Sequence, residues 1–423
     1  MANARKLAAR ALLKVENDLA FSNIVLNENL SNSDASDSDR ALASAIFYGV
    51  LDRKITVDYY LSRLIKTPIQ KTAPFTLAVL RSAVYQIKFM DKIPQSAAVN
   101  EAVKLIKASK ESRNASFVNA VLRNLIRTDI ELPNDNSVKS LSVRYSCPEW
   151  IIKSFVSDYG EETAEKLLIE SLNPPPLTIR VNTLQTYKES LKLELNKLGI
   201  PCEDGKTENS LIIKKGIEIA NCDLYKKGYF HAQDSASQTA VAVLNPKMGE
   251  RVLDICAAPG GKSFTMAELM ENSGEIIACD LYSQRTGLIE KGAKRLGINI
   301  ITAKTADATV FDSTLGEFDC ILCDVPCSGL GVLRRKPEIK YKAQEDFTAL
   351  EEIQLKILKN AFKYLKKGGK LLYSTCTLRQ NENEKLVNCA LMEYNGLHKM
   401  YEHTFMPHID KTDGFYCALI VKE

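Results

Sequence analysis

The sequence predicts a multidomain protein of three parts: an all-helical N-terminal bundle, a small α/β subdomain and a C-terminal α/β domain with a doubly wound parallel sheet. Apolar residues recur at helical spacing through the segment 1–130. A strand–helix–strand pattern lies within 171–230, and from residue 250 onward apolar strand patterns alternate with helical ones. This alternation is typical of a parallel sheet covered by helices.

The composition is that of a globular protein, since 45% of the 423 residues are hydrophobic. The formal net charge of +4 is too small to indicate a nucleic-acid partner by itself. No apolar stretch is long enough to span a bilayer, and the N-terminus lacks a continuous apolar signal segment. The 11 cysteines follow no regular framework, so we expect reduced thiols, a cytoplasmic location and no membrane partner.

Four segments follow one another along the chain. Residues 1–130 are predicted to form the helical bundle, which shows no catalytic constellation. Residues 131–170 are predicted to be a linker over 131–145 and then a helical segment. Residues 171–230 contain LTIRVNT, LKLELNKLGI and SLIIKK, which predict a strand, a helix and a strand. In the last segment, 231–423, strands are expected at 251–256, 275–280, 299–304, 318–324 and 369–375, with a final strand over DGFYCALIV.

The parallel sheet is predicted to begin with the stretch RVLDICAAPGGK, residues 251–262. An apolar strand is followed by a Pro-Gly-Gly turn at 259–261 and by a helical pattern from Lys262. Such a turn lets a ligand approach the backbone at the positive end of the helix. It matches neither GxGxxG nor GxxxxGK(S/T), which favours an adenosine-bearing ligand other than a dinucleotide or a nucleoside triphosphate. Asp280 ends the next apolar run, where a ribose-binding carboxylate is expected.

Three motifs together resemble the signature set of RNA cytosine-5 methyltransferases, which use S-adenosylmethionine. They are DICAAPGGK at 254–262, DVPCSGLG at 324–331 and YSTCT at 373–377. In the N-terminal segment, DRALASAIFYGVL, LRSAVYQI and SFVNAVLRNLIR resemble the NusB fold. The resemblance covers most of the chain and points to the bacterial Sun/Fmu branch, which acts on 16S (small-subunit) ribosomal RNA. It implies a NusB-like RNA-binding domain, an RRM-like middle subdomain and a Rossmann-like class I methyltransferase domain.

The resemblance also implies which residues hold S-adenosylmethionine. The loop after the first strand would hold the methionine part, Asp280 the ribose hydroxyls and Asp307 the adenine, while Asp324 would serve both cofactor and base. The implied set comprises Cys256, Ala257, Ala258, Pro259, Gly260, Gly261, Lys262, Asp280, Asp307 and Asp324. The ordinary alternatives are that Asp280 or Asp307 ends a strand or caps a helix, and that Lys262 is a solvated first-turn residue.

Two cysteines supply the groups that methylation at C5 of cytosine requires. C5 is a weak nucleophile until a thiolate adds to C6, and a base must later remove the proton from C5. Cys327 and Cys376 both follow predicted strands at their carboxyl ends, where open α/β sheets bind their ligands. Asp324, just before Cys327, is the candidate group near N3 of the base.

Either cysteine is a candidate nucleophile. DNA cytosine-5 methyltransferases attack with the cysteine of a Pro-Cys motif, which corresponds to Cys327. The RNA family uses the cysteine of the later TCT motif, which corresponds to Cys376. The resemblance therefore assigns Cys376 as the nucleophile and Cys327 to product release, whereas the ordinary alternative is a pair of incidental buried thiols.

The spacing of the remaining cysteines does not predict a metal site. Cys320, Cys323 and Cys327 are spaced Cx2Cx3C, a close spacing of the kind that metal-binding cysteines show. Cys320 and Cys323 are, however, three residues apart on a predicted strand and point to opposite faces. We therefore expect no metal cofactor.

Basic residues near Cys327 are candidates for RNA contacts. Arg334, Arg335 and Lys336 form a loop suited to RNA phosphates. Arg180, in RVNT, is a further candidate, with a salt bridge as its ordinary alternative. Because the target base must be unstacked, we expect a single-stranded or loop region of 16S ribosomal RNA, free of ribosomal proteins, as the partner of a monomeric enzyme.

Other functions compete with methylation of 16S ribosomal RNA. The same chemistry could act on another RNA, such as transfer RNA, and only the NusB-like segment favours ribosomal RNA over it. The cysteine of the TCT motif disfavours DNA as the substrate. Amino-group methyltransferases usually carry (D/N)PP(Y/F) where this chain has DVPC. A non-catalytic NusB-like RNA-binding or antitermination factor would have no need of two thiols in these loops.

Overall fold

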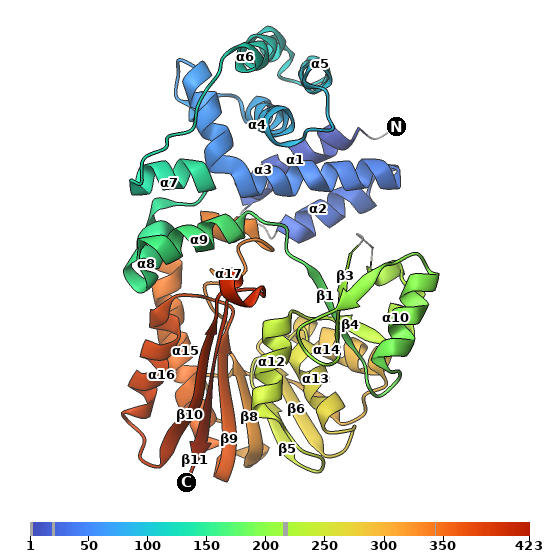
Figure 1. Ribbon diagram of the computed structural model, residues 1–423, viewed down its shortest axis with the longest axis vertical. Helices are drawn as coiled ribbons and strands as arrows, with labels where there is room; N and C mark the ends of the chain where they lie inside the picture. The colour runs from blue at the N-terminus through green and yellow to red at the C-terminus, as the bar shows by residue number, and fades with distance from the viewer. Residues whose placement is uncertain (1–2, 19–21, 215–218, 343) are drawn as a thin grey trace. The chain divides into compact units, whose positions relative to one another are not determined.

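The computed structural model describes residues 3–18, 22–214, 219–342 and 344–423. The chain divides into two compact units, which Figure 1 shows with their helices and strands labelled. The first unit comprises Met1–Asn173 together with Leu333–Lys342, and the second comprises Pro174–Val332 and Ala343–Glu423. Within the described ranges, no helix is long and apolar enough to cross a bilayer.

The first unit is built from helices that surround an apolar core. Its α-helices are α1 (Ala4–Asp18), α2 (Ser22–Ser31), α3 (Asp37–Leu64), α4 (Pro74–Phe89), α5 (Gln95–Lys107), α6 (Ala115–Arg127), α7 (Val138–Tyr145), α8 (Glu149–Tyr159) and α9 (Glu161–Ser171). Ala8, Phe47, Val84 and Leu122 lie fully buried in one cluster that joins α1, α3, α4 and α6. Apolar residues at helical spacing therefore form the core of the bundle, as the sequence predicts.

The segment Leu333–Lys342 folds with the first unit although it follows a strand of the second. It contains the short 3-10 helix η5 (Pro337–Tyr341). The fully buried Lys340 donates from Nζ to Asp52 Oδ1 at 2.8 Å, and the Tyr341 hydroxyl donates to the Leu51 carbonyl at 2.7 Å. A buried ion pair and a hydrogen bond thus fasten this segment to α3.

A small antiparallel sheet forms the first part of the second unit. Its strands are β1 (Leu177–Val181), β2 (Cys202–Asp204), β3 (Ser210–Ile213) and β4 (Phe230–Ala232), and its helices are α10 (Lys188–Lys197) and α11 (Asp223–Lys226). The strand order is β2-β3-β1-β4, with every pair antiparallel. Ile179, Leu191, Leu211 and Phe230 form its buried core. This is the ferredoxin-like arrangement that RRM-like domains share, and it agrees with the prediction.

A seven-stranded sheet forms the rest of the second unit. Its strands are β5 (Arg251–Asp254), β6 (Glu275–Asp280), β7 (Ile301–Thr305), β8 (Phe318–Asp324), β9 (Leu365–Thr375), β10 (Leu397–Phe405) and β11 (Phe415–Lys422). They lie in the order β10-β11-β9-β8-β5-β6-β7. Strands β5 to β9 run parallel, whereas β10 and β11 form an antiparallel hairpin at one edge. The doubly wound Rossmann-like fold is therefore confirmed.

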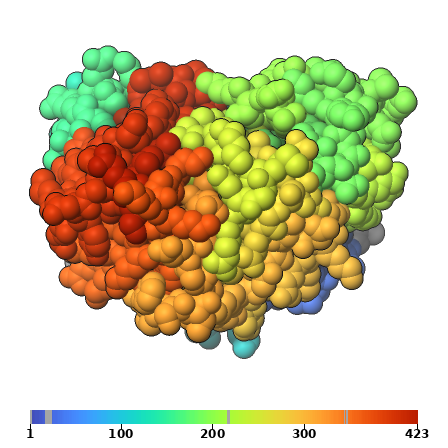
Figure 2. Space-filling view, turned by 90° about the horizontal axis from the view of Figure 1, so that it is seen from below, coloured from blue at the N-terminus to red at the C-terminus, as the bar shows by residue number. Residues whose placement is uncertain are grey.

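Helices cover both faces of the seven-stranded sheet. The helices are α12 (Ser235–Leu244), α13 (Gly261–Leu269), α14 (Ser283–Leu296), α15 (Glu345–Lys363), α16 (Glu384–Leu391) and the short α17 (Pro407–Asp410). Val252 packs in the core under α12 to α14, and its neighbour Leu253 packs in the core under α15 and α16. Successive strand residues point to opposite faces, so both faces of the strand are apolar. In Figure 2 the ferredoxin-like subdomain, in green, adjoins the yellow chain of α12 and α13.

Several element predictions differ from the structure, which contains β2 and β4 in addition to the strand, helix and strand predicted for 171–230. The expected linker 131–145 contains α7, which Ser137 caps by accepting the N–H of Ser140. Strand β9 begins at Leu365 and not at 369, because its pairing with β8 continues past a register shift near Cys320. Strand β10 was not predicted, since its outer position leaves most of its residues exposed or half-buried and weakens the apolar signal.

Candidate active site

The residues of the three motifs gather at the carboxyl ends of β5 to β9 (Figure 1). These strands are parallel, so their carboxyl ends meet at one edge of the sheet, where open α/β sheets bind ligands. The loop 255–260 follows β5, Asp280 ends β6, Asp307 follows β7, Asp324 ends β8 ahead of Cys327, and Cys376 follows β9. Residues from distant parts of the chain therefore form one site.

The loop between β5 and α13 brings its backbone close to the space in front of the sheet. Gly260 has φ 108° and is the N-cap of α13, and a Cβ at this position would lie 2.4 Å from the Phe264 ring. The N–H of Ala257 donates to the Cys279 carbonyl at 2.7 Å. Gln233 Nε2 donates to the Gly261 carbonyl at 3.1 Å. A left-handed glycine and hydrogen bonds with two neighbouring segments thus fix the path of the turn.

Asp254, at the end of β5, is a buried carboxylate that the sequence analysis did not single out as a site residue. It is 1% exposed, and the Ser263 hydroxyl donates to its Oδ2 at 2.6 Å. Its Oδ1 is buried and has no hydrogen-bond partner among the described residues. Burial raises the pKa of Asp254 to about 7. Its place at the head of the motif was visible in the sequence, whereas its burial was not.

The two carboxylates expected at the ribose and the adenine differ in their surroundings. Asp280 is buried, accepts the Ala258 N–H at 3.3 Å and lies 3.2 Å from Arg285 Nη1. Asp307 is exposed, and its Oδ1 accepts both the N–H and the hydroxyl of Thr309. These bonds from Thr309 lower the pKa of Asp307. Asp280 is therefore oriented by the loop 255–260, whereas Asp307 bonds within its own turn.

These residues fit S-adenosylmethionine. A glycine turn without a Cβ admits the ligand to the backbone, the N-terminus of α13 favours a carboxylate, and Asp280 can accept bonds from two ribose hydroxyls. The thiol of Cys256 has a pKa well above its ordinary value because it is buried, so it contributes to the wall of the site as a neutral group.

Asp324 joins the cofactor loop to the strands that carry the thiols. Its Oδ2 accepts from Lys262 Nζ at 2.6 Å, and its Oδ1 accepts from the Ser374 hydroxyl at 2.8 Å. Burial opposes the charge of Lys262, but the attraction of Asp324 outweighs it and raises the pKa of Lys262. Lys262 is thus a fixed positive charge beside Asp324, and both oxygens of Asp324 are oriented by neighbours.

The two candidate thiols lie side by side. The Sγ atoms of Cys327 and Cys376 are 3.3 Å apart, although 49 residues separate them in the chain. The hydrogen bond to Cys376, together with burial, raises the pKa of Cys327 well above its ordinary value. Both side chains are half-buried. The structure therefore brings the two candidate thiols together, at the sheet edge where β8 and β9 end.

The structure corrects the prediction that Arg180 contacts RNA. Arg180 is 5% exposed, and its Nε donates to Glu268 Oε2 at 2.6 Å. Burial raises the pKa of Glu268 to about 7, even though Arg180 acts to lower it. This salt bridge ties strand β1 of the ferredoxin-like subdomain to helix α13 behind the cofactor loop. Local sequence could not reveal the pairing, because Glu268 lies 88 residues away.

The other residues predicted to contact RNA lie in the segment Leu333–Lys342, which folds with the first unit. Arg334 and Arg335 are half-buried and Lys336 is exposed. Their contact with RNA phosphates stays a prediction.

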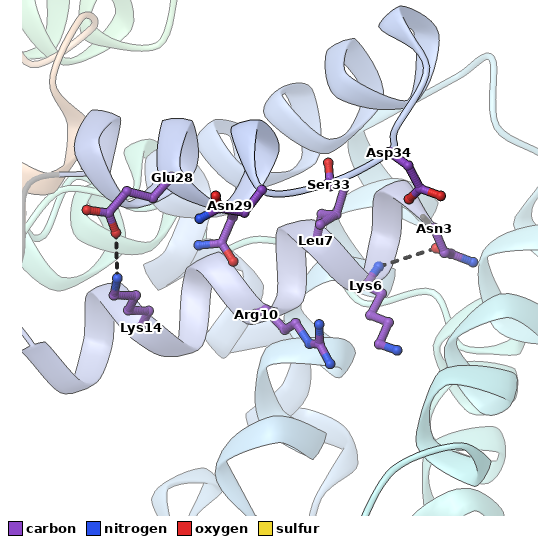
Figure 3. Close-up of a pocket in the computed structure, with 10 residues that line it drawn as sticks. Asn3, Lys6, Leu7, Arg10, Lys14, Glu28, Asn29, Ser33 and Asp34 are labelled. Carbon is purple, nitrogen blue, oxygen red and sulfur yellow. Dashed lines mark hydrogen bonds and ion pairs between the residues drawn. The ribbon is translucent and has the colours of Figure 1, made fainter. Parts of the chain in front are cut away.

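A hollow in the first unit lies between α1 and α2 (Figure 3). Lys6, Arg10 and Lys14 reach it from α1, opposite Glu28 of α2 and Asp34 beyond that helix. Lys14 Nζ lies 2.7 Å from Glu28 Oε2. Cations and carboxylates largely offset one another here, so this hollow lacks the uniformly basic lining that favours a phosphate backbone.

Comparisons with known proteins decide the family. The family described as 16S rRNA methyltransferase RsmB/F matches residues 241–421, the NusB family matches 2–127, and the ferredoxin-like domain of RsmF/B-like methyltransferases matches 147–220. A probable ribosomal RNA small subunit methyltransferase B of Bacillus subtilis (strain 168) is 38% identical over 442 residues, which cover 99% of this chain and 98% of that protein. The chain belongs to the RsmB/F family of 16S rRNA methyltransferases. This RsmB/F protein is an S-adenosylmethionine-dependent ribosomal RNA methyltransferase.

Further relatives and solved structures agree with the family. A ribosomal RNA small subunit methyltransferase B of Shewanella oneidensis is 32% identical and covers 92% of this RsmB/F chain and 90% of its own. The crystal structure of PH0851 superposes with a TM-score of 0.85 at 26% identity, covering 100% of this chain and 99% of its own. A methyltransferase homologue from Pyrococcus horikoshii has a TM-score of 0.61 at 26% identity, covering 69% of this chain and all of its own. The predicted family and cofactor are therefore confirmed.

Proposed function

We propose that this RsmB/F methyltransferase transfers a methyl group to C5 of a cytosine in 16S ribosomal RNA through a covalent bond between Cys376 and C6 of the base. The observation that supports this most is the contact of the two thiols, 3.3 Å apart, at the sheet edge that also carries Asp324. S-adenosylmethionine, when bound, supplies the electrophilic methyl group that C5 accepts.

Cys376 is the proposed nucleophile. Its thiolate forms a bond to C6, and the electron pair of the C5–C6 double bond then makes C5 nucleophilic. Negative charge that spreads onto the ring toward N3 is stabilised by the fixed positive charge of Lys262, while Asp324 accepts a hydrogen bond from the amino group beside N3. Ser374 keeps the Asp324 carboxylate in position during this step.

Cys327 is proposed to release the product. Once C5 carries the methyl group, the proton on C5 must leave so that its electron pair rebuilds the C5–C6 double bond and expels the Cys376 thiolate. The raised pKa means that Cys327 starts as a neutral thiol, so it first gives its own proton to solvent water, and the resulting strongly basic thiolate then accepts the proton from C5. Its contact with Cys376 places it beside the bond that breaks.

The proposed substrate is a single-stranded or loop region of 16S ribosomal RNA, because the base must be unstacked to reach both thiols. We assign Arg334, Arg335 and Lys336 to RNA phosphates. The NusB-like segment 1–130 is assigned to RNA binding, and 231–423 to catalysis, with 131–170 and 171–230 between them. We further propose that the enzyme is a monomer and that it acts in the cytoplasm on RNA free of ribosomal proteins.

The test is transfer of labelled methyl from S-adenosylmethionine to deproteinised 16S ribosomal RNA by the wild type, Cys376→Ala, Cys327→Ala and Cys389→Ala. Cys389 is an exposed cysteine of α16 and serves as the matched control. We expect Cys376→Ala to lose more than roughly 10³-fold in rate, as removal of a nucleophile does. Cys327→Ala should accumulate a covalent protein–RNA adduct, and Cys389→Ala should match the wild type.

Three outcomes would contradict parts of the proposal. An adduct from Cys376→Ala in place of Cys327→Ala would reverse the two roles. Activity of Cys376→Ala close to that of the wild type would remove it as the nucleophile. Methylation of transfer RNA but not of 16S ribosomal RNA would contradict the proposed substrate.

A further inference from the structure

The two thiols stand in loops after different strands, and the strand pairing alone does not fix how close they come. Cys327 lies in the loop after β8, and Cys376 lies in the loop after β9. Both loops are bonded by the short segment that contains η6 (Gln380–Glu382) and Asn383. Building on the proposed function, we propose that Glu382 and Asn383 are positioning residues that set the separation of the two thiols.

Glu382 holds the loop of Cys327 from both sides. Its Oε2 accepts the N–H of Ser328 at 2.8 Å and Nε2 of Gln354 at 2.9 Å. The same Gln354 nitrogen donates to the Pro326 carbonyl at 2.9 Å. The residues just before and just after Cys327 are therefore tied, one directly and one through Gln354, to a single carboxylate that is fully buried.

Asn383 holds the loop of Cys376 in the same manner. Its Oδ1 accepts the hydroxyl of Thr375 at 2.6 Å, and its Nδ2 donates to the Thr377 carbonyl at 3.1 Å. Asn383, Thr375 and Thr377 are all fully buried. One amide thus fixes both neighbours of Cys376, while the adjacent residue, Glu382, fixes the neighbours of Cys327.

Further bonds make the two loops and this segment a single hydrogen-bonded unit. The hydroxyls of Ser328 and Thr377 lie 2.7 Å apart across the two loops. The Tyr373 hydroxyl donates to the backbone carbonyl of Glu382 at 2.7 Å, and Arg379 Nη1 donates to Glu382 Oε1 at 3.2 Å. Because all of these groups except Arg379 are buried, water cannot replace a lost partner without rearrangement.

The separation of the thiols matters because both act on one base. A misplacement of about 1 Å in a reacting group can cost on the order of 10²-fold in rate. The loops contain polar and glycine residues, DVPCSGLG and TCTLRQ, whose own conformational preferences do not define a single position. The adjacent residues Glu382 and Asn383 bond to both loops and so fix their positions relative to each other.

The test measures the proximity of the thiols without RNA or cofactor. Phenylarsine oxide binds two neighbouring thiols: each S–H is replaced by an As–S bond, and the oxygen leaves as water with the two protons. We would titrate it into the wild type, Glu382→Gln, Asn383→Ala and the double variant. The single variants Cys327→Ala and Cys376→Ala define binding by other cysteines. Asn182→Ala is the matched control, since Asn182 is equally buried and bonds two backbone carbonyls far from this site in the chain, those of Gly228 and Leu296.

We expect Asn383→Ala and the double variant to lose at least about 10-fold in arsenical affinity and about 10²-fold in kcat, with KM for S-adenosylmethionine within about threefold. Glu382→Gln keeps an acceptor for Ser328 and should lose less. Asn182→Ala should lower the thermal midpoint but leave arsenical affinity and kcat per folded molecule unchanged. Unchanged arsenical affinity and kcat in folded Asn383→Ala and double variants would overturn the proposal. A fall in arsenical affinity together with a wild type that does not methylate 16S ribosomal RNA would uphold the positioning role and reject the proposed substrate.

Discussion

Asp254 shows how burial gives a motif residue a property that its type does not predict. Its Oδ2 accepts the Ser263 hydroxyl, and its buried Oδ1 is unpartnered among the described residues. Desolvation raises its pKa to about 7, from an ordinary value of 3.8. The folded protein therefore holds a proton that the unfolded chain releases between about pH 4 and pH 7.

The raised pKa predicts that stability falls as pH rises. The contribution of Asp254 is complete below about pH 4 and is lost as pH rises through about 7, by up to roughly 4 kcal/mol for a shift of about three units. Asp254→Asn should remove this part of the pH dependence of unfolding. The measurement is the urea midpoint of the second unit at pH 5 and at pH 8.

Glu268→Gln provides a comparison, because the pKa of Glu268 is also raised to about 7 by burial. Each variant should flatten part of the wild-type slope, and the two effects should add, since the groups do not contact each other. If the urea midpoint of Asp254→Asn changes between pH 5 and pH 8 as much as that of the wild type, this carboxylate is already ionised in the folded protein at pH 5.

At the scale of elements, three chain segments cross behind the thiols. The N–H of Gly331 donates to the Cys376 carbonyl at 3.0 Å, and the N–H of Gly414 donates to the Gly331 carbonyl at 2.9 Å. A Cβ at Gly331 would lie 2.0 Å from the Gly414 carbonyl oxygen and 2.8 Å from that of Cys376. The loop after β8, the loop after β9 and the turn before β11 can meet only because glycine stands here.

Gly331→Ala should therefore destabilise the protein and slow methyl transfer. Overpacking against backbone costs about 1–3 kcal/mol or more, and displacing the Cys376 loop should lower the rate by about 10²-fold. The measurements are the thermal midpoint and single-turnover transfer of labelled methyl. Gly287→Ala, in α14 with nothing within 4 Å of its Cβ, should instead stabilise by about 0.5–1 kcal/mol. Equal thermal midpoints and equal transfer rates in the two variants would show that the three segments move apart without cost.

At the scale of the whole molecule, each of the two units is built from two separate stretches of the chain. The segment Leu333–Lys342 begins six residues after Cys327, yet it folds with the first unit. Lys340 is fully buried there against Asp52, and Lys54 Nζ lies 4.9 Å from the centre of the Tyr341 ring. The segment that follows the loop of Cys327 is therefore fixed within the helical unit.

Lys340→Ala should destabilise the first unit by about 1–3 kcal/mol, because it leaves the partly exposed Asp52 carboxylate without its buried partner. Thermal unfolding followed by calorimetry and limited proteolysis of the segment Leu333–Lys342 would measure the effect. Lys342→Ala, at an exposed position, is the control and should unfold as the wild type does. If the two variants unfold alike, the buried ion pair does not hold the segment.

The sequence by itself determined the fold class and the family, together with the residues that stand at the strand ends. Apolar runs closed by Asp280 or Asp324 predict parallel strands, and a Pro-Gly-Gly turn predicts the loop before α13. The motifs around Cys327 and Cys376 are specific enough to predict the family. These are local patterns, and local patterns are set by neighbouring residues along the chain.

Only the tertiary structure decided which distant groups meet. The contact of Cys327 with Cys376, the burial of Arg180 against Glu268 and the anchoring of both thiol loops by Glu382 and Asn383 join residues that no periodicity relates. Each depends on strand order, on the paths of loops and on which side chains are removed from water. A carboxylate or a guanidinium has the same letter in the sequence whether it faces solvent or the core, and its charge, pKa and role follow from that difference.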